Sequence, residues 1–132
     1  MTNLLSKEER TVLEGVLRQR LADLMEEIRQ DLLKSDDDRA AMLADRVRDV
    51  GDESMADLIV DLDLADTDRD LQELKDVEAA LMRMRLGTYG TCMHCGGPIR
   101  VERLAAYPTA ERCQPCQAMH EKTYVQQGHA SL

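Results

Sequence analysis

The chain has 132 residues and a formal net charge of −9, and it lacks both Phe and Trp. A composition rich in Leu, Val, Ala and Met, with 33% charged residues, favours long amphipathic helices over a β-sandwich or barrel. The acidity disfavours direct binding to nucleic acid or to an anionic membrane, and no apolar run reaches the length of a membrane span. Because the N-terminal residues also lack the apolar stretch of a secretory signal, we expect a cytoplasmic protein.

The first helix is predicted to begin near Lys7, because Ser6 followed by Glu9 matches a capping box. Apolar residues then recur at spacings of three and four, at Leu13, Leu17, Leu21, Leu24, Ile28 and Leu32, and the pattern resumes at Leu43, Val47 and Val50. Ser35 and the three aspartates at 36–38 repeat the cap pattern, so the helix either continues through this point or breaks and restarts there.

A second helix is predicted over residues 54–86. Ser54 and Asp57 form another capping pattern, and basic residues in the last turn followed by Gly87 are typical of a helix end. Its apolar face is formed by Leu58, Leu62, Leu64, Leu71, Leu74, Val77, Leu81 and Met84. Two long helices joined by a few residues return antiparallel, so residues 7–86 predict a coiled-coil hairpin whose apolar faces bury each other.

Four cysteines follow as Cys92-x2-Cys95, seventeen intervening residues, and Cys113-x2-Cys116. A two-residue gap lets a tight turn direct both sulfurs at one ion, and two such turns complete a tetrahedron around Zn²⁺. A shell of four thiolates leaves no position for water or substrate, so one structural zinc ion is expected. We also expect Tyr89, Ile99, Leu104 and Tyr107 to pack around this site.

Two disulfides or an iron–sulfur cluster are the less favoured uses of four cysteines. A reducing cytoplasm disfavours the disulfides, and iron–sulfur clusters use other typical spacings. His94 and His120 are expected at the surface. A last helix is predicted to begin near Pro115, which suits a first helical turn, and to end before Gly128, so the zinc finger and this helix occupy residues 87–127.

Further residues follow a specific spacing around the cysteine pairs: Gly87, Tyr89, Gly90, Gly96, Ile99, Arg103, Leu104, Ala106 and Pro108. Together with the four cysteines, this pattern resembles the zinc finger of the DksA/TraR family. Met93 departs from the family, which usually has an acidic residue or Ser there, at a position that is not a ligand. The resemblance extends over the hairpin, and so implies a mainly α protein with a long hairpin, a small C4 zinc finger and a C-terminal helix.

The resemblance also implies a function. Members of this family regulate RNA polymerase without binding promoter DNA, by inserting an antiparallel coiled coil into the secondary channel of the enzyme. It therefore implies a monomeric protein that binds core polymerase and carries an acidic tip near residues 49–54. Asp49 and Asp52 match the family's pair of tip aspartates, and Ser54 stands where Ala is common.

Some members of the family act together with the alarmone ppGpp. Arg69 matches one basic position of the ppGpp site, but Asp76 and Gln117 replace two of the family's lysines. Because a carboxylate next to a pyrophosphate is unfavourable, the resemblance implies a weak or absent response to ppGpp. The N-terminal segment is also shorter than in the best-known members, so the chain resembles a shorter paralogue.

Other classes of function remain as alternatives. A zinc-stabilised coiled-coil adaptor for another protein partner fits the acidity and the helices equally well. A nucleic-acid-binding zinc finger is less favoured, because Arg100, Arg103 and Arg112 are few basic residues against a net charge of −9. An enzyme is not expected, since the sequence has no Gly-rich phosphate loop, no nucleophile motif and no open metal site.

Overall fold

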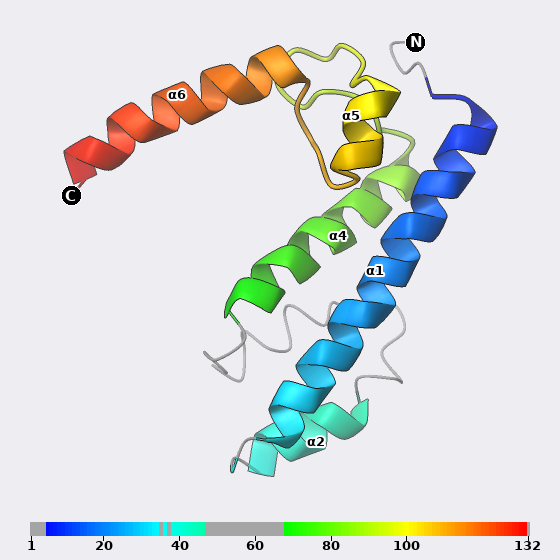
Figure 1. Cartoon of the computed structure of the whole chain (residues 1–132), viewed down its shortest axis with the longest axis vertical. Helices are drawn as coiled ribbons and strands as arrows, with labels where there is room; N and C mark the ends of the chain where they lie inside the picture. The colour runs from blue at the N-terminus through cyan, green and yellow to red at the C-terminus, as the bar shows by residue number, and fades with distance from the viewer. Residues whose placement is uncertain (1–4, 35, 37, 47–67, 132) are drawn as a thin grey trace.

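The structure, a computed structural model, describes residues 5–34, 36, 38–46 and 68–131, with the backbone alone at residues 68 and 124–131. Within these ranges the chain is helical, with an isolated bridge between Thr91 and Pro98. The helices are α1 (Lys7–Leu33), α2 (Asp38–Arg46), α4 (Asp68–Leu86), α5 (Val101–Ala106) and α6 (Gln114–Ser131) (Figure 1). The prediction of a mainly α fold is therefore confirmed.

The start of α1 agrees with the capping box in the sequence. The Ser6 side chain accepts a hydrogen bond from the Glu9 backbone N–H at 3.0 Å, and the Glu9 carboxylate accepts one from the Ser6 N–H at 2.9 Å. These bonds satisfy backbone donors that the first turn of a helix leaves free. The helix therefore begins at Lys7, where the sequence predicts it.

The two helices α1 and α4 lie side by side and antiparallel (Figure 1). Leu17 and Leu24 of α1 share a buried cluster with Val77 and Ala80 of α4. An apolar side chain fully buried in this way contributes about 1.5–3 kcal/mol, so the seam is the main source of cohesion between the helices. The described parts of both helices thus form the predicted hairpin.

An ion pair crosses the same helix interface at its edge. The Arg20 guanidinium donates two hydrogen bonds to the Glu73 carboxylate, one of them 2.7 Å long. The hydrogen bond from Arg20 lowers the pKa of Glu73. Both side chains are about two-fifths exposed, so the pair adds at most about 1 kcal/mol and serves mainly to set the register of α4 on α1.

The first predicted helix does not continue through residues 35–38. Instead α1 ends at Leu33, and α2 packs back against α1. The contact is a buried cluster formed by Ile28, Leu32, Ala40, Leu43, Ala44 and Leu74. Two alanines on α2 allow a close approach, and α2 thereby covers the apolar surface of α1 at Ile28 and Leu32.

The C-terminal helix differs from the prediction in its end. It begins at Gln114, next to the expected Pro115, but continues through Gly128 to Ser131. A glycine inside a helix costs only about 1 kcal/mol relative to alanine, so it does not by itself end one. Figure 1 shows α6 projecting away from the hairpin. None of the helices in the described ranges is long and apolar enough to cross a membrane.

Truncating Leu24 tests the hairpin seam. We expect Leu24→Ala to lower the free energy of unfolding by about 2–5 kcal/mol, because the side chain is fully buried and its loss leaves a cavity. Leu33→Ala is the matched control, since that leucine is 48% exposed at the end of the same helix. Urea unfolding of the zinc-loaded protein measures both, and equal losses in the two variants would contradict the seam.

Candidate metal centre

The first cysteine pair lies in a tight turn after α4. In this turn the Cys92 N–H donates to the Gly97 carbonyl at 2.8 Å, and the Gly96 N–H donates to the Cys92 carbonyl at 3.0 Å. Gly96 has a φ of 76°, a left-handed conformation that other residues adopt only with strain. The glycine after Cys95 is therefore required by the turn that directs both sulfurs to the same side.

The second pair lies at the start of α6. Cys113 immediately precedes the helix, Cys116 is in its first turn, and the Gln117 N–H donates to the Cys113 carbonyl at 2.9 Å. A hydrogen bond of 2.8 Å from the Met93 N–H to the Glu111 carbonyl joins the two halves of the site. The helical turn and this backbone bond bring the second pair against the first.

The four sulfurs form a compact cluster in which every Sγ lies within 4.8 Å of the others. Sulfurs bound to one zinc ion at about 2.3 Å in a tetrahedron are about 3.8 Å apart, and the Cys95 and Cys113 sulfurs are separated by 3.8 Å. Backbone N–H groups of His94 and Cys95 point at the Cys92 sulfur, and that of Gly97 points at the Cys95 sulfur, each at 3.4 Å. The donor set therefore fits a tetrahedral zinc ion.

The ionisation of the clustered cysteines depends on a bound cation. Burial opposes ionisation of Cys92, but hydrogen bonds led by those from the backbone N–H groups of Cys95 and Cys113 lower its pKa to about 6. In the absence of an ion, the hydrogen bond with the Cys113 sulfur raises the pKa of Cys116 to about 12. Four thiolates cannot coexist at neutral pH without a cation, so zinc binding must displace protons from this site.

The zinc site shares its hydrophobic surroundings with the hairpin. Tyr89, Ile99 and Leu104 are buried, as predicted, in the same cluster as Cys92 and the α1 leucines. The prediction for Tyr107 was wrong: it is 63% exposed, and its ring lies 5.7 Å from the Arg103 guanidinium carbon. Tyr107 follows the last residue of α5, where the chain has already turned toward solvent.

Of the remaining predicted site residues, the structure describes Arg69 and does not place it at the zinc site. Asp49, Asp52 and Ser54 lie outside the described residues. Arg69 is exposed in the first turn of α4. Gln117 directly follows the ligand Cys116 in α6, so it lies beside the zinc ligands. Seventeen residues of α4, or about 25 Å, separate Arg69 from the zinc module.

Asp76 lies between these two ends of α4, where its carboxylate accepts a hydrogen bond from the Gln72 amide at 3.2 Å. Its negative charge thus remains on the helix that carries Arg69. Because the amide neutralises none of this charge, the surroundings of Asp76 do not favour a pyrophosphate.

Two arginines have contacts that the sequence pattern did not reveal. In the sequence, Arg83 is recognisable only as a basic residue in the last turn of a helix. In the structure its guanidinium donates to the Thr109 carbonyl. Arg103 was noted for its spacing, and its Nε donates to the Arg112 carbonyl at 3.0 Å. The first bond spans 26 residues and the second 9, and both acceptors are backbone carbonyls, which a pattern of residue types does not indicate.

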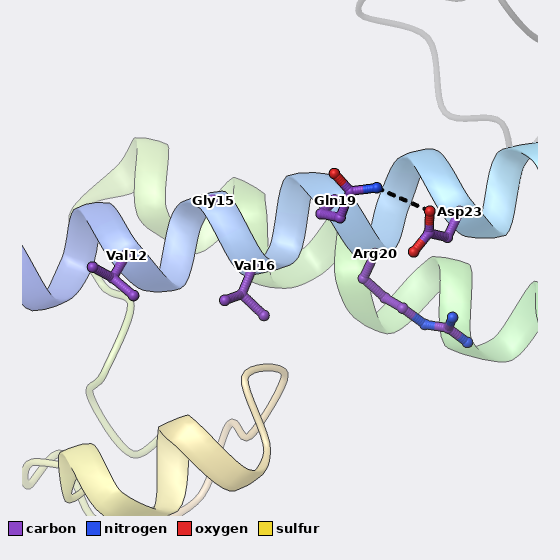
Figure 2. Close-up of a pocket in the computed structure, with 6 residues that line it drawn as sticks. All are labelled: Val12, Gly15, Val16, Gln19, Arg20 and Asp23. Carbon is purple, nitrogen blue, oxygen red and sulfur yellow. Dashed lines mark hydrogen bonds between the residues drawn. The ribbon is translucent and has the colours of Figure 1, made fainter.

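An open groove of about 500 Å³ runs along the outer side of α1 (Figure 2). Its lining residues are Val12, Gly15, Val16, Gln19, Arg20 and Asp23. The Gln19 amide donates to the Asp23 carboxylate at 3.0 Å, and Arg20 is bonded to Glu73. The polar groups of the groove are thus paired along or between helices, and they do not converge on a common point as catalytic groups do.

Comparisons with known proteins agree with this geometry. Residues 87–122 match the sequence model of the prokaryotic dksA/traR C4-type zinc finger. The chain is 33% identical over 90 residues to the RNA polymerase-binding transcription factor DksA of Caulobacter vibrioides, which covers 68% of this chain and 58% of that protein. It is 37% identical over 60 residues to the protein of the same name from Haemophilus influenzae, covering 46% of this chain and 41% of the relative.

The fold is similar to that of transcription factor DksA2 from Pseudomonas aeruginosa, with a TM-score of 0.58 and 25% sequence identity over 89% of this chain and 87% of that one. The chain belongs to the DksA/TraR family. Its four cysteines are accordingly the C4 site of that family and hold one structural zinc ion. The chain matches only about two-fifths to three-fifths of the length of these curated DksA/TraR relatives.

Replacing one ligand tests the zinc site. We expect Cys113→Ser to lower the melting temperature by several degrees and to reduce bound zinc well below one ion per chain, because three sulfurs leave the tetrahedron open. Calorimetry and metal analysis after dialysis measure the two effects. Met93→Ala, in the turn of the first cysteine pair, is the control, since that side chain is exposed and is not a ligand. A Cys113→Ser protein with unchanged melting and full zinc would contradict the assignment.

Proposed function

We propose that this protein is a transcription regulator that binds core RNA polymerase through the secondary channel of the enzyme. The supporting observation is the combination of an antiparallel α1–α4 hairpin and a C4 zinc module that share one buried core. Relatives with the same zinc finger are named RNA polymerase-binding transcription factors. A narrow pair of helices is a shape that can enter a channel as a monomer, with the wider zinc module remaining at the entrance.

The charge of the protein supports a protein partner rather than DNA. At −9 the chain is repelled by phosphates but attracted to basic surfaces, and such steering raises association rates with an oppositely charged partner. Two arginines of the zinc module have partners: Arg112 lies within 4 Å of Glu111, and Arg103 is bonded to a backbone carbonyl. Arg83, at the end of α4, also lies within 4 Å of Glu111. The module therefore presents few cations for nucleic acid.

The active part of the protein is proposed to be the acidic tip at residues 49–54. Asp49 and Asp52 belong to the segment that connects α2 to α4. Carboxylates at this point can interact with a Mg²⁺-bearing active centre or with basic polymerase elements near it. The closed sulfur shell performs no reaction of its own, so we assign the protein a regulatory role and no enzymatic activity.

The response to ppGpp is proposed to be weak or absent. A pyrophosphate needs several converging cations, whereas Arg69 lies in the first turn of α4 and Gln117, on α6, is uncharged. Asp76 adds a negative charge to the helix that carries Arg69. The regulator should therefore act to the same extent with and without ppGpp.

Binding to core polymerase is the first test. We expect zinc-loaded protein to bind core polymerase at micromolar concentration in a pull-down, with binding that weakens as salt rises, because the attraction is partly electrostatic. Absence of binding at this concentration would overturn the proposal and favour an adaptor for another protein partner.

The tip is tested by removing its charge. We expect Asp49→Asn with Asp52→Asn to abolish the effect on transcription in vitro while binding to core polymerase is retained. The matched control is Asp36→Asn with Asp38→Asn, which removes the same charge from exposed positions at the start of α2. A tip variant that regulates a sensitive promoter as well as wild type would show that Asp49 and Asp52 are not the active groups.

A further inference from the structure

The segment 108–112 connects α5 to the second cysteine pair without forming a helix or strand. A segment of this kind cannot satisfy its own backbone carbonyls, so their partners must come from elsewhere. Four carbonyls of the segment accept hydrogen bonds from residues outside it. The Pro108 carbonyl accepts from the Tyr89 hydroxyl at 2.7 Å, that of Thr109 from Arg83 at 3.3 Å, that of Glu111 from the Met93 N–H at 2.8 Å, and that of Arg112 from Arg103 Nε at 3.0 Å. Each contact lies within five residues of the ligand Cys113.

Two of these partners, Arg83 and Tyr89, lie at the end of α4 and just after it. Arg83 lies in the last turn of α4 with only 18% of its side chain exposed, and its guanidinium also lies 3.9 Å from the Glu111 carboxylate. Its backbone carbonyl accepts hydrogen bonds from the N–H groups of Thr88 and Tyr89 at 2.9 and 3.2 Å. One residue of the hairpin thus contacts the chain before the first cysteine pair and the chain before the second.

Tyr89 completes this connection from inside the core. Its side chain is 1% exposed, and burial raises the pKa of its hydroxyl to about 12. The hydroxyl therefore remains protonated and donates to the Pro108 carbonyl at all ordinary pH values. A buried hydroxyl that lost this acceptor would cost about 1–3 kcal/mol, so Pro108 is held firmly at this distance.

We propose that Arg83 and Tyr89 are positioning residues for the zinc site, holding the segment 108–112 so that Cys113 completes the tetrahedron. Neither residue is a ligand or touches the ion; both act through the backbone that carries the ligand. The affinity for zinc is thereby coupled to the end of the hairpin, since the side chain that locates Cys113 is part of α4. Partners of this outer kind typically change metal affinity by about 10–100-fold when they are removed.

The test measures the rate at which zinc leaves the full-length, zinc-loaded protein in the presence of excess chromogenic chelator. We expect Arg83→Met to release zinc about tenfold faster than wild type. Arg85→Met is the matched control, because it removes the same charge two residues away, where the guanidinium is exposed and 3.5 Å from Met82 Sδ. Arg83→Lys should fall between wild type and Arg83→Met, since an ammonium keeps the charge but cannot reach both acceptors.

Tyr89→Phe gives an independent measurement, because it removes one hydroxyl and keeps the ring in the core. Tyr89→Phe should also accelerate zinc release. If circular dichroism shows that Arg83→Met has lost helix, the release rate of Tyr89→Phe alone is used to test the proposal. Leu32→Ala destabilises the α1–α2 cluster away from the zinc site and should lower the melting temperature without accelerating release. Release rates in Arg83→Met and Tyr89→Phe within twofold of wild type, or an equal acceleration in Leu32→Ala, would overturn the proposal.

Discussion

The mutual repulsion of four cysteine thiolates is the constraint on which the base of this structure depends. The hydrogen bond with the Cys113 sulfur raises the pKa of Cys116 to about 12 in the absence of an ion, so all four sulfurs are thiolates at neutral pH only when a cation is bound. The two cysteine pairs come from chain segments seventeen residues apart. Zinc therefore holds the start of α6 against the turn after α4. A module of this size cannot achieve this through apolar burial alone.

The zinc module and the hairpin are one folding unit rather than two. Cys92, Tyr89 and Leu104 lie in the same buried cluster as the leucines of α1, and Arg83 of α4 bonds to the segment that leads to Cys113. Loss of zinc should therefore loosen the packing at the end of the hairpin that lies next to the zinc module. At its far end α2 closes a separate cluster around Leu32 and Leu74, which has no contact with the metal ligands. This division agrees with the proposal that the acidic tip, and not the zinc module, is the active part of the protein.

Local patterns predicted much of this fold because their physical causes are local. The capping box fixes the start of α1, and the leucine spacing identifies the residues that are buried, such as Leu24. The cysteine spacing identifies the zinc ligands, because two pairs with two-residue gaps are typical of a four-cysteine zinc site. The position of α2 was not predictable in this way, since Leu43 continues the apolar spacing of α1 whether the helix goes on or folds back.

What sequence reasoning missed depends on contacts between distant segments. The bond from Arg83 to the Thr109 carbonyl spans 26 residues and involves a backbone acceptor that no residue type reveals. Tyr107 was expected to pack around the zinc site, but it follows the last residue of α5 and is exposed. Gly128 was expected to end α6, and the helix tolerates it. The acidic tip at residues 49–54 stays a prediction, because it lies outside the described residues.

The central claim is that one zinc ion in a closed four-sulfur shell holds the base of the hairpin. X-ray absorption at the zinc edge of the purified protein, combined with metal analysis, tests it most directly. We expect one zinc ion per chain with four sulfur neighbours at about 2.3 Å and no nitrogen or oxygen ligand. A shell with a nitrogen or oxygen neighbour, or substantially less than one zinc ion per folded chain, would contradict it.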